Sequence, residues 1–107
     1  MSNLDFTICC TVTFYSKKRR TPPNLNNGKY CPHLVIKDFD QLLGVKFIDG
    51  EAVIFDKSIR ANVLPVNEDI DCSALQVGTE FLIVDSGNVV GEGIVKEIFQ
   101  HKLYGSK

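Results

Sequence analysis

Residues 4–15 read LDFTICCTVTFY, and this stretch decides the fold class. Every second residue from Leu4 to Phe14 is apolar or cysteine, whereas the residues between them are mostly polar. A period of two over twelve residues, rich in β-branched and aromatic types, predicts a strand with one buried face. The chain therefore begins its folded part with a strand rather than a helix.

Further strand patterns follow, separated by turn residues. They cover Tyr30–Ile36, Leu43–Ile48, Glu51–Phe55, Ser58–Val66, Glu80–Val84 and Val89–Phe99. Asp49-Gly50 and Ser86-Gly87-Asn88 contain residue types favoured in tight hairpins, so we expect a hairpin at each. Pro32 has no N–H, which places the early part of its strand at a sheet edge or beside a bulge. Six or seven short strands without helical periodicity predict an all-β closed barrel or sandwich.

Length and composition fit one domain. The chain has 107 residues, of which 44% are hydrophobic and 23% charged, so it can bury a core without metal or disulfide staples. We expect the barrel over about residues 4–99 and a frayed polar tail over 100–107. The N-terminal residues do not resemble a signal peptide, and no apolar run reaches the ~20 residues of a membrane span. The four cysteines are then expected to be reduced, in the cytoplasm.

Charge is polarised along the chain. The net charge is −1, but residues 1–37 carry +5, residues 38–92 carry −8 and residues 93–107 carry +2. Bulk charge therefore does not make the whole molecule a polyanion binder, and any attraction for anions is expected to be local.

The basic residues concentrate in a predicted loop over residues 16–30. Lys17, Lys18, Arg19 and Arg20 are followed by TPPNLNNG, whose prolines and Asn-Asn-Gly tip cannot continue a strand. The run is either a solvated loop or a patch that binds an anionic partner, with Tyr15 and Tyr30 available for stacking. An acidic protein surface would satisfy it as well as RNA.

Several segments resemble the C-terminal (third) domain of elongation factor Tu. They are Arg20-Thr21-Pro22-Pro23, Tyr30-Cys31-Pro32-His33-Leu34, Phe81-Leu82-Ile83-Val84 and Gly87-Asn88-Val89-Val90-Gly91-Glu92-Gly93-Ile94-Val95. The resemblance covers roughly residues 4–99 and implies a six-stranded antiparallel closed barrel as a stand-alone domain. It also implies contact with tRNA or the translation machinery.

Three positions depart from the pattern of that family. Cys31 and Asn88 stand where the family has arginine, and Glu92 replaces a small residue between two glycines. Losing cations and adding a carboxylate weakens attraction for phosphate. From the residues themselves, Gly87, Gly91 and Gly93 are expected to permit positive φ, a bulge or close backbone approach. The candidate partner-binding residues are Lys17, Lys18, Arg19, Arg20, Thr21, Tyr30, His33, Asn88 and Glu92.

Motifs of enzymes are missing from the sequence. There is no nucleotide-binding GxxxxGK[ST] loop, no Cys-x-x-Cys pair and no nucleophile elbow, so we expect no nucleotide, metal or other cofactor. Cys31 and His33, two apart on a strand, are expected to pack in the core, although a small cysteine-dependent enzyme would use this pair. The sequence predicts a non-catalytic binding module, with a decoy that imitates the translation-factor barrel as the alternative. It leaves the oligomeric state open.

Overall fold

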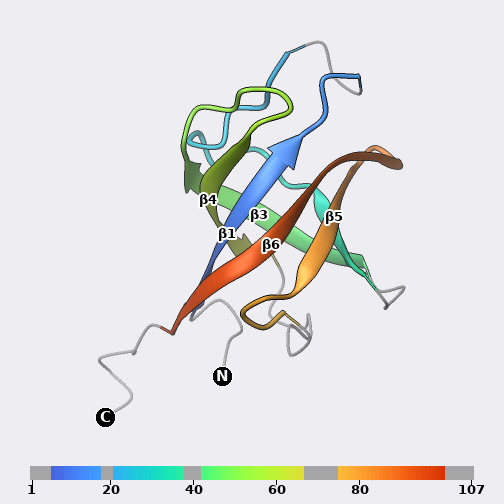
Figure 1. Cartoon of the computed structure of the whole chain (residues 1–107). Helices are drawn as coiled ribbons and strands as arrows, with labels where there is room; N and C mark the ends of the chain where they lie inside the picture. Colours follow the sequence, from blue (N-terminus) through green and yellow to red (C-terminus); the bar gives the residue numbers. More distant parts are fainter. Residues whose placement is uncertain (1–5, 18–20, 38–41, 67–74, 101–107) are drawn as a thin grey trace.

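The computed structural model describes residues 6–17, 21–37, 42–66 and 75–100, and they form a closed six-stranded barrel (Figure 1). The strands are β1 (Phe6–Phe14), β2 (His33–Ile36), β3 (Leu42–Gly50), β4 (Ser58–Pro65), β5 (Glu80–Asp85) and β6 (Asn88–Gln100). Their order around the barrel is β1-β4-β3-β2-β5-β6, and all neighbouring pairs are antiparallel. The predicted all-β barrel is confirmed.

Alternation along the strands builds the core. In β1, Ile8, Cys10, Val12 and Phe14 are all fully buried, as the period of two predicts. The other large buried side chains come from every remaining strand, among them Phe47 of β3 and Phe81 of β5. Because a closed barrel has no free edge, each strand gives one face to this single interior.

Two glycines let β6 approach its neighbours closely. A Cβ atom on Gly91 would lie 2.5 Å from the carbonyl oxygen of Thr13 in β1. A Cβ atom on Gly93 would lie 2.8 Å from the carbonyl oxygen of Thr11 and 2.6 Å from the ring of Phe81. Any other residue would force the strands apart, so the close approach expected from the sequence is confirmed.

The turn between β5 and β6 is a two-residue hairpin. Ser86 and Gly87 have φ angles of 53° and 81°, the pair of positive values that a type I′ turn needs. This turn matches the twist of the flanking strands, and Asn88 already belongs to β6. The predicted final hairpin is therefore confirmed.

The hairpin predicted at Asp49-Gly50 is wrong. β3 continues to Gly50, which pairs with Ala61 of β4, and residues 51–55 form a loop rather than a strand. A Cβ atom on Gly50 would lie 2.8 Å from the Leu25 side chain, so glycine serves close packing here rather than a turn. The positive φ of this connection falls on Asp56, at 65°.

β2 begins later than the sequence suggested. The segment before it still lies along β3, because the carbonyls of Tyr30 and Pro32 accept hydrogen bonds from the N–H groups of Phe47 and Val45 at 3.0 and 3.1 Å. Pro32 has no N–H with which to donate a hydrogen bond to β3. Pairing with both β3 and β5 starts only at His33. The segment around Pro32 therefore follows β3 without the ladder to β5, which agrees with the edge position expected for it.

The described ranges contain no helix, and hence none with the length and apolarity to cross a bilayer. Gln100, predicted as part of the tail, ends β6, and the remaining tail residues lie outside the described part of the chain.

Candidate functional site

The antiparallel order brings three connections to one end of the barrel, drawn at the top of Figure 1. They are the β1–β2 connection (described as residues 15–17 and 21–32), the β3–β4 connection (residues 51–57) and the β5–β6 turn (residues 86–87). We name these residues, with the strand ends beside them, the loop end. Most of the predicted partner-binding residues belong to it.

Part of the long β1–β2 connection is fastened to the barrel. Leu25 is 2% exposed and belongs to the core cluster. The Asn26 side chain accepts a hydrogen bond from the Gly50 N–H at 3.1 Å and donates one to its carbonyl at 3.0 Å, as a further strand would. The sequence predicted a loop over residues 16–30 that is either solvated or binds a partner, but burial of Leu25 holds the segment from Leu25 to Asn26 against the barrel.

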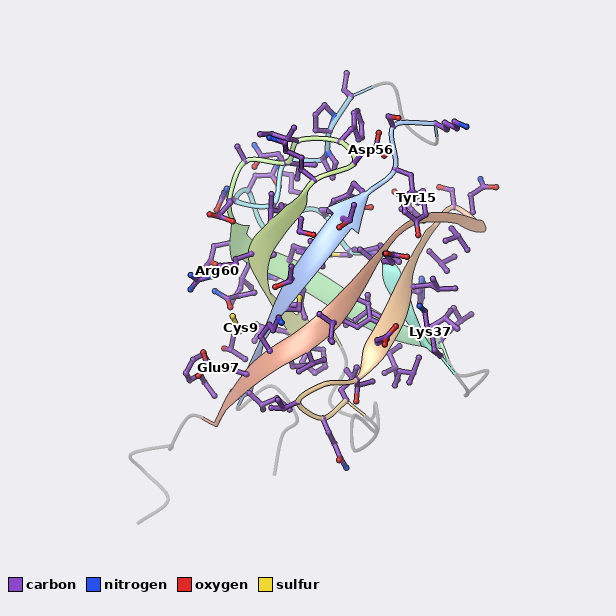
Figure 2. All side chains as sticks on the ribbon, viewed as in Figure 1. Cys9, Tyr15, Lys37, Asp56, Arg60 and Glu97 are labelled. Atoms are coloured by element: carbon purple, nitrogen blue, oxygen red, sulfur yellow. The ribbon has the colours of Figure 1, made fainter. Side chains whose placement is uncertain are left out.

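Two carboxylates hold the start of the same connection. The Tyr15 hydroxyl donates to Glu92 Oε1 at 2.9 Å, and the Ser16 N–H donates to Asp56 Oδ1 at 3.2 Å. Tyr15 and Asp56 lie near one another at the upper end of the barrel (Figure 2). Partial burial, and then the hydrogen bond and charge of Glu92, raise the pKa of Tyr15. The base of the basic run is thus fixed in position.

The loop end carries exposed cations. Lys17, Lys29 and Lys57 are exposed, and they come from the two longer connections of the loop end. Lys18, Arg19 and Arg20 lie outside the described residues. They link Lys17 to Thr21 in the sequence, and both of these flanking residues are exposed at the loop end.

Tyr30 does not offer its ring to a partner. The ring centroid lies 6.0 Å from that of Phe14 and 5.6 Å from that of Phe47, both of which are fully buried. Tyr30 is half-buried, and this aromatic packing leaves its ring less available for stacking on a partner than the sequence suggested.

The Cys31 and His33 side chains are exposed on the outer wall, so the predicted core packing of this pair is wrong. Both precede or begin β2 with the parity that points away from the interior, whereas Leu34 and Ile36 point inward. In the described part of the chain, no hydrogen bond joins the Cys31 thiol to His33. Cys9, Cys10 and Cys31 are free thiols.

Asn88 and Glu92 both lie on β6 near the loop end, and both are exposed. The Asn88 amide donates to the Ser86 carbonyl at 3.4 Å and so closes the turn, whereas Glu92 is engaged by Tyr15. Their contacts give both residues a structural part in shaping the loop end.

A hollow of about 310 Å³ lies on the wall where β1, β3 and β4 meet. Its lining includes Cys9 and Arg60, whose side chains point outward on the same side of the barrel (Figure 2). Asn62 donates to Asp49 Oδ1 at 2.6 Å across the hollow, and the Arg60 N–H donates to Glu51 Oε1 at 2.8 Å. These contacts join β3 and the residue after it to β4, so the polar groups that line the hollow serve to hold the wall of the barrel together.

One exposed residue of the loop end escaped the sequence reasoning. Ile54 is 55% exposed in the β3–β4 connection, which had been predicted as a strand. The turn residues Asp56 and Lys57 that follow Ile54 indicate a loop at this position rather than a strand. An exposed aliphatic side chain beside lysines gives the loop end a mixed apolar and cationic surface.

Within the described ranges, no group of three or more His, Cys, Asp or Glu residues is arranged to hold a metal ion. Neither a protein-family model nor a curated protein matches the chain.

Proposed function

We propose that this chain is a non-catalytic binding module that engages a partner with a negatively charged surface through its loop end. The observation that carries the proposal is the fixed base of the basic run. Glu92 and Asp56 hold Tyr15 and Ser16, and exposed Lys17 and Lys57 stand beside them. A cation held on a rigid scaffold loses less entropy on binding than one on a free arm.

A protein partner is favoured over RNA. Exposed Ile54 and Pro22 lie on the same two connections as the lysines, and aliphatic contact area is used by protein interfaces more than by phosphate backbones. Tyr30, which could have stacked on a base, is packed in the barrel. The resemblance to the elongation factor Tu domain supports a place in the translation machinery for such a partner.

Charge reversal tests the proposal. Affinity capture from native lysate should recover a partner with the wild-type chain and lose it with Lys17, Lys18, Arg19 and Arg20 all changed to Glu. Nuclease treatment separates the two partner classes, because an RNA-dependent complex is lost and a direct protein complex persists. Recovery of the same partner by the four-fold variant would overturn the proposal.

A matched pair of variants separates local from bulk charge. Lys17→Glu/Lys57→Glu and Lys37→Glu/Lys96→Glu alter net charge equally, but only the first pair lies at the loop end. We expect the first pair to weaken capture by about tenfold or more and the second to leave it unchanged, because screening limits the reach of surface charges to about 10 Å. Equal weakening by both pairs would mean that only net charge matters.

A further inference from the structure

The step from Asn27 to Gly28 lies on the β1–β2 connection, and no other asparagine of the chain precedes a glycine. The Asn27 side chain is exposed, and Gly28 is half-buried. In such a step the backbone nitrogen of the glycine can attack the side-chain amide carbon of the asparagine. Glycine permits this attack because it has no Cβ atom to stand in the way. The step is therefore a candidate for spontaneous chemical modification.

The nitrogen of Gly28 is accessible. A Cβ atom added to Gly28 would meet no heavy atom within 4 Å, so no other segment crowds this part of the connection. The φ angle of Gly28 is 70°, in the left-handed region that glycine adopts readily. Among the described residues, no hydrogen bond engages the Gly28 N–H. The attacking atom therefore loses no hydrogen bond within the protein when it reacts.

The side-chain carbonyl of Asn27 is polarised for the same reaction. Its Oδ1 accepts a hydrogen bond from the Lys29 N–H at 3.0 Å. Attack on the amide carbon places negative charge on this oxygen. A backbone N–H that is already in position stabilises such a developing charge. The turn thus holds a donor at the atom where the transition state needs one.

The other asparagines of the connection lack these conditions. The Asn26 side chain donates to the Gly50 carbonyl at 3.0 Å and accepts from the Gly50 N–H at 3.1 Å, so its amide is fixed at both atoms. Asn24 precedes Leu25, whose side chain is buried in the core and holds the backbone there in place. Both asparagines are also followed by residues that have a Cβ atom.

The related step from Asp49 to Gly50 is protected by β3. The Gly50 N–H is donated to Asn26 Oδ1, and Asp49 Oδ1 accepts a hydrogen bond from Asn62 at 2.6 Å. The nitrogen and the carboxylate that would react are therefore both engaged, and the strand keeps them extended. The same type of dipeptide is thus protected in the barrel wall and unprotected in the connection.

We propose that Asn27 deamidates spontaneously in the folded chain. The Gly28 nitrogen gives its proton to a solvent base and bonds to the side-chain carbon of Asn27. The carbon–nitrogen bond of the side-chain amide breaks, and the nitrogen takes a proton from water and leaves as ammonia. Water then adds to either carbonyl of the five-membered imide and opens it to aspartate or isoaspartate. The net reaction converts an amide and water into a carboxylate and ammonium, with water as the only co-reactant.

Deamidation changes the charge and the chain length of the loop end. The new carboxylate lies two residues from exposed Lys29 and offsets its charge. Isoaspartate also adds one carbon to the main chain between two fixed points, Asn26 on Gly50 and the Tyr30 carbonyl, which accepts from the Phe47 N–H at 3.0 Å. Both changes weaken binding to a negatively charged partner. This consequence rests on the proposed function, whereas the reaction itself does not.

Peptide mapping of the incubated, folded chain tests the reaction. Trypsin releases residues 21–29 as one peptide, which contains Asn24, Asn26 and Asn27. After several days in mildly alkaline H₂¹⁸O, Asn27 should carry an ¹⁸O-labelled carboxylate, whereas Asn24 and Asn26 should remain amides. Asn27→Gln is the matched control and should stay unmodified, because glutamine would have to form a less favourable six-membered ring. An intact Asn27, or deamidation that starts at Asn24 or Asn26, would overturn the proposal.

Capture with Asn27→Asp separates this inference from the proposed function. The variant should retain the partner about twofold to fivefold less well than the wild type, as for the loss of one exposed ion pair, and Asn27→Gln should match the wild type. Equal capture by the wild type and Asn27→Asp overturns the effect of deamidation on binding. Capture that survives reversal of all four charges from Lys17 to Arg20 overturns the proposed function instead, and the peptide map decides the reaction in either case.

Discussion

The two sides of the barrel wall differ in what they turn outward. Over β1 and the first half of β4 the outward side chains are threonine, cysteine, serine, arginine and asparagine. Over β2, β3 and β5 they include Val35, Leu42, Leu82 and Val84 beside the polar His33 and Lys46. The polar side pairs its groups locally, as in the 3.1 Å contact between the hydroxyl groups of Thr13 and Ser58. The same antiparallel architecture thus carries a polar surface on one side and a mixed, partly aliphatic surface on the other.

The largest effect is expected at a glycine of β6 that lies against β1, compared with a glycine on the outer wall of β3. Gly91→Ala would set a Cβ atom 2.5 Å from a backbone oxygen of β1, so the strands must separate, at a cost of about 3 kcal/mol in unfolding free energy. Gly44→Ala, on the outer wall of β3, would set its Cβ 3.0 Å from the end of the Val66 side chain, which can rotate away, at a cost under about 1 kcal/mol. Urea unfolding of both variants measures the contrast. Equal losses would show that β1 and β6 are not held at their close approach.

Alkaline pH tests the burial of Cys10, the inward cysteine of β1. Burial, with a smaller contribution from Cys9, raises the pKa of the Cys10 thiol from 9.0 to about 12. Between those values the thiol ionises in the unfolded chain but not in the folded one, so its contribution to the unfolding free energy falls as pH rises. The fall is about 1.4 kcal/mol per pH unit.

The measurement compares the wild type with Cys10→Ala by urea unfolding at pH 8, 9.5 and 10.5 under reducing conditions. The stability of the wild type relative to the variant should shrink as pH rises above 9. If the unfolding free energies of the two proteins changed equally with pH, the result would contradict the burial of the Cys10 thiol.

The smallest effect is expected at the top of the polar side. Tyr15→Phe removes the 2.9 Å hydrogen bond to Glu92, which is exposed, so unfolding free energy should fall by about 0.5 kcal/mol. The hydrogen bond from Tyr15 to Glu92 is one of two that hold the start of the basic run against the barrel. We therefore expect Tyr15→Phe to lower the amount of partner captured as well. Unchanged capture would show that this attachment does not position the cations.

Sequence reasoning succeeded where the outward side is polar and failed where it is not. The alternation along β1 is clean because its outward side chains from Cys9 to Thr13 are partly exposed, and Ser58 and Arg60 of β4 behave likewise. In residues 33–36 both sides are largely aliphatic, so the pattern could not tell which side chains point inward, and Cys31 and His33 were misplaced.

The loop end was predictable in composition but not in shape. Its lysines stand out in the sequence, whereas the packing of Leu25 against Gly50 joins residues 25 positions apart and leaves no local signal. The Asp49-Gly50 pair has the composition of a hairpin, and only this long-range contact shows why glycine is needed there. The turn-like composition of Asp49-Gly50 therefore led to the wrong prediction of a strand over Glu51–Phe55.

We propose that a partner binds the loop end and not the wall of the barrel. Two-dimensional ¹H–¹⁵N NMR during titration with the captured partner tests this most directly, since binding shifts the signals of residues near the interface. We predict shifts for residues 15–17 and 51–57 and constant signals along β2, β3 and β5. Shifts concentrated on the wall of the barrel, with constant signals at the loop end, would contradict this proposal.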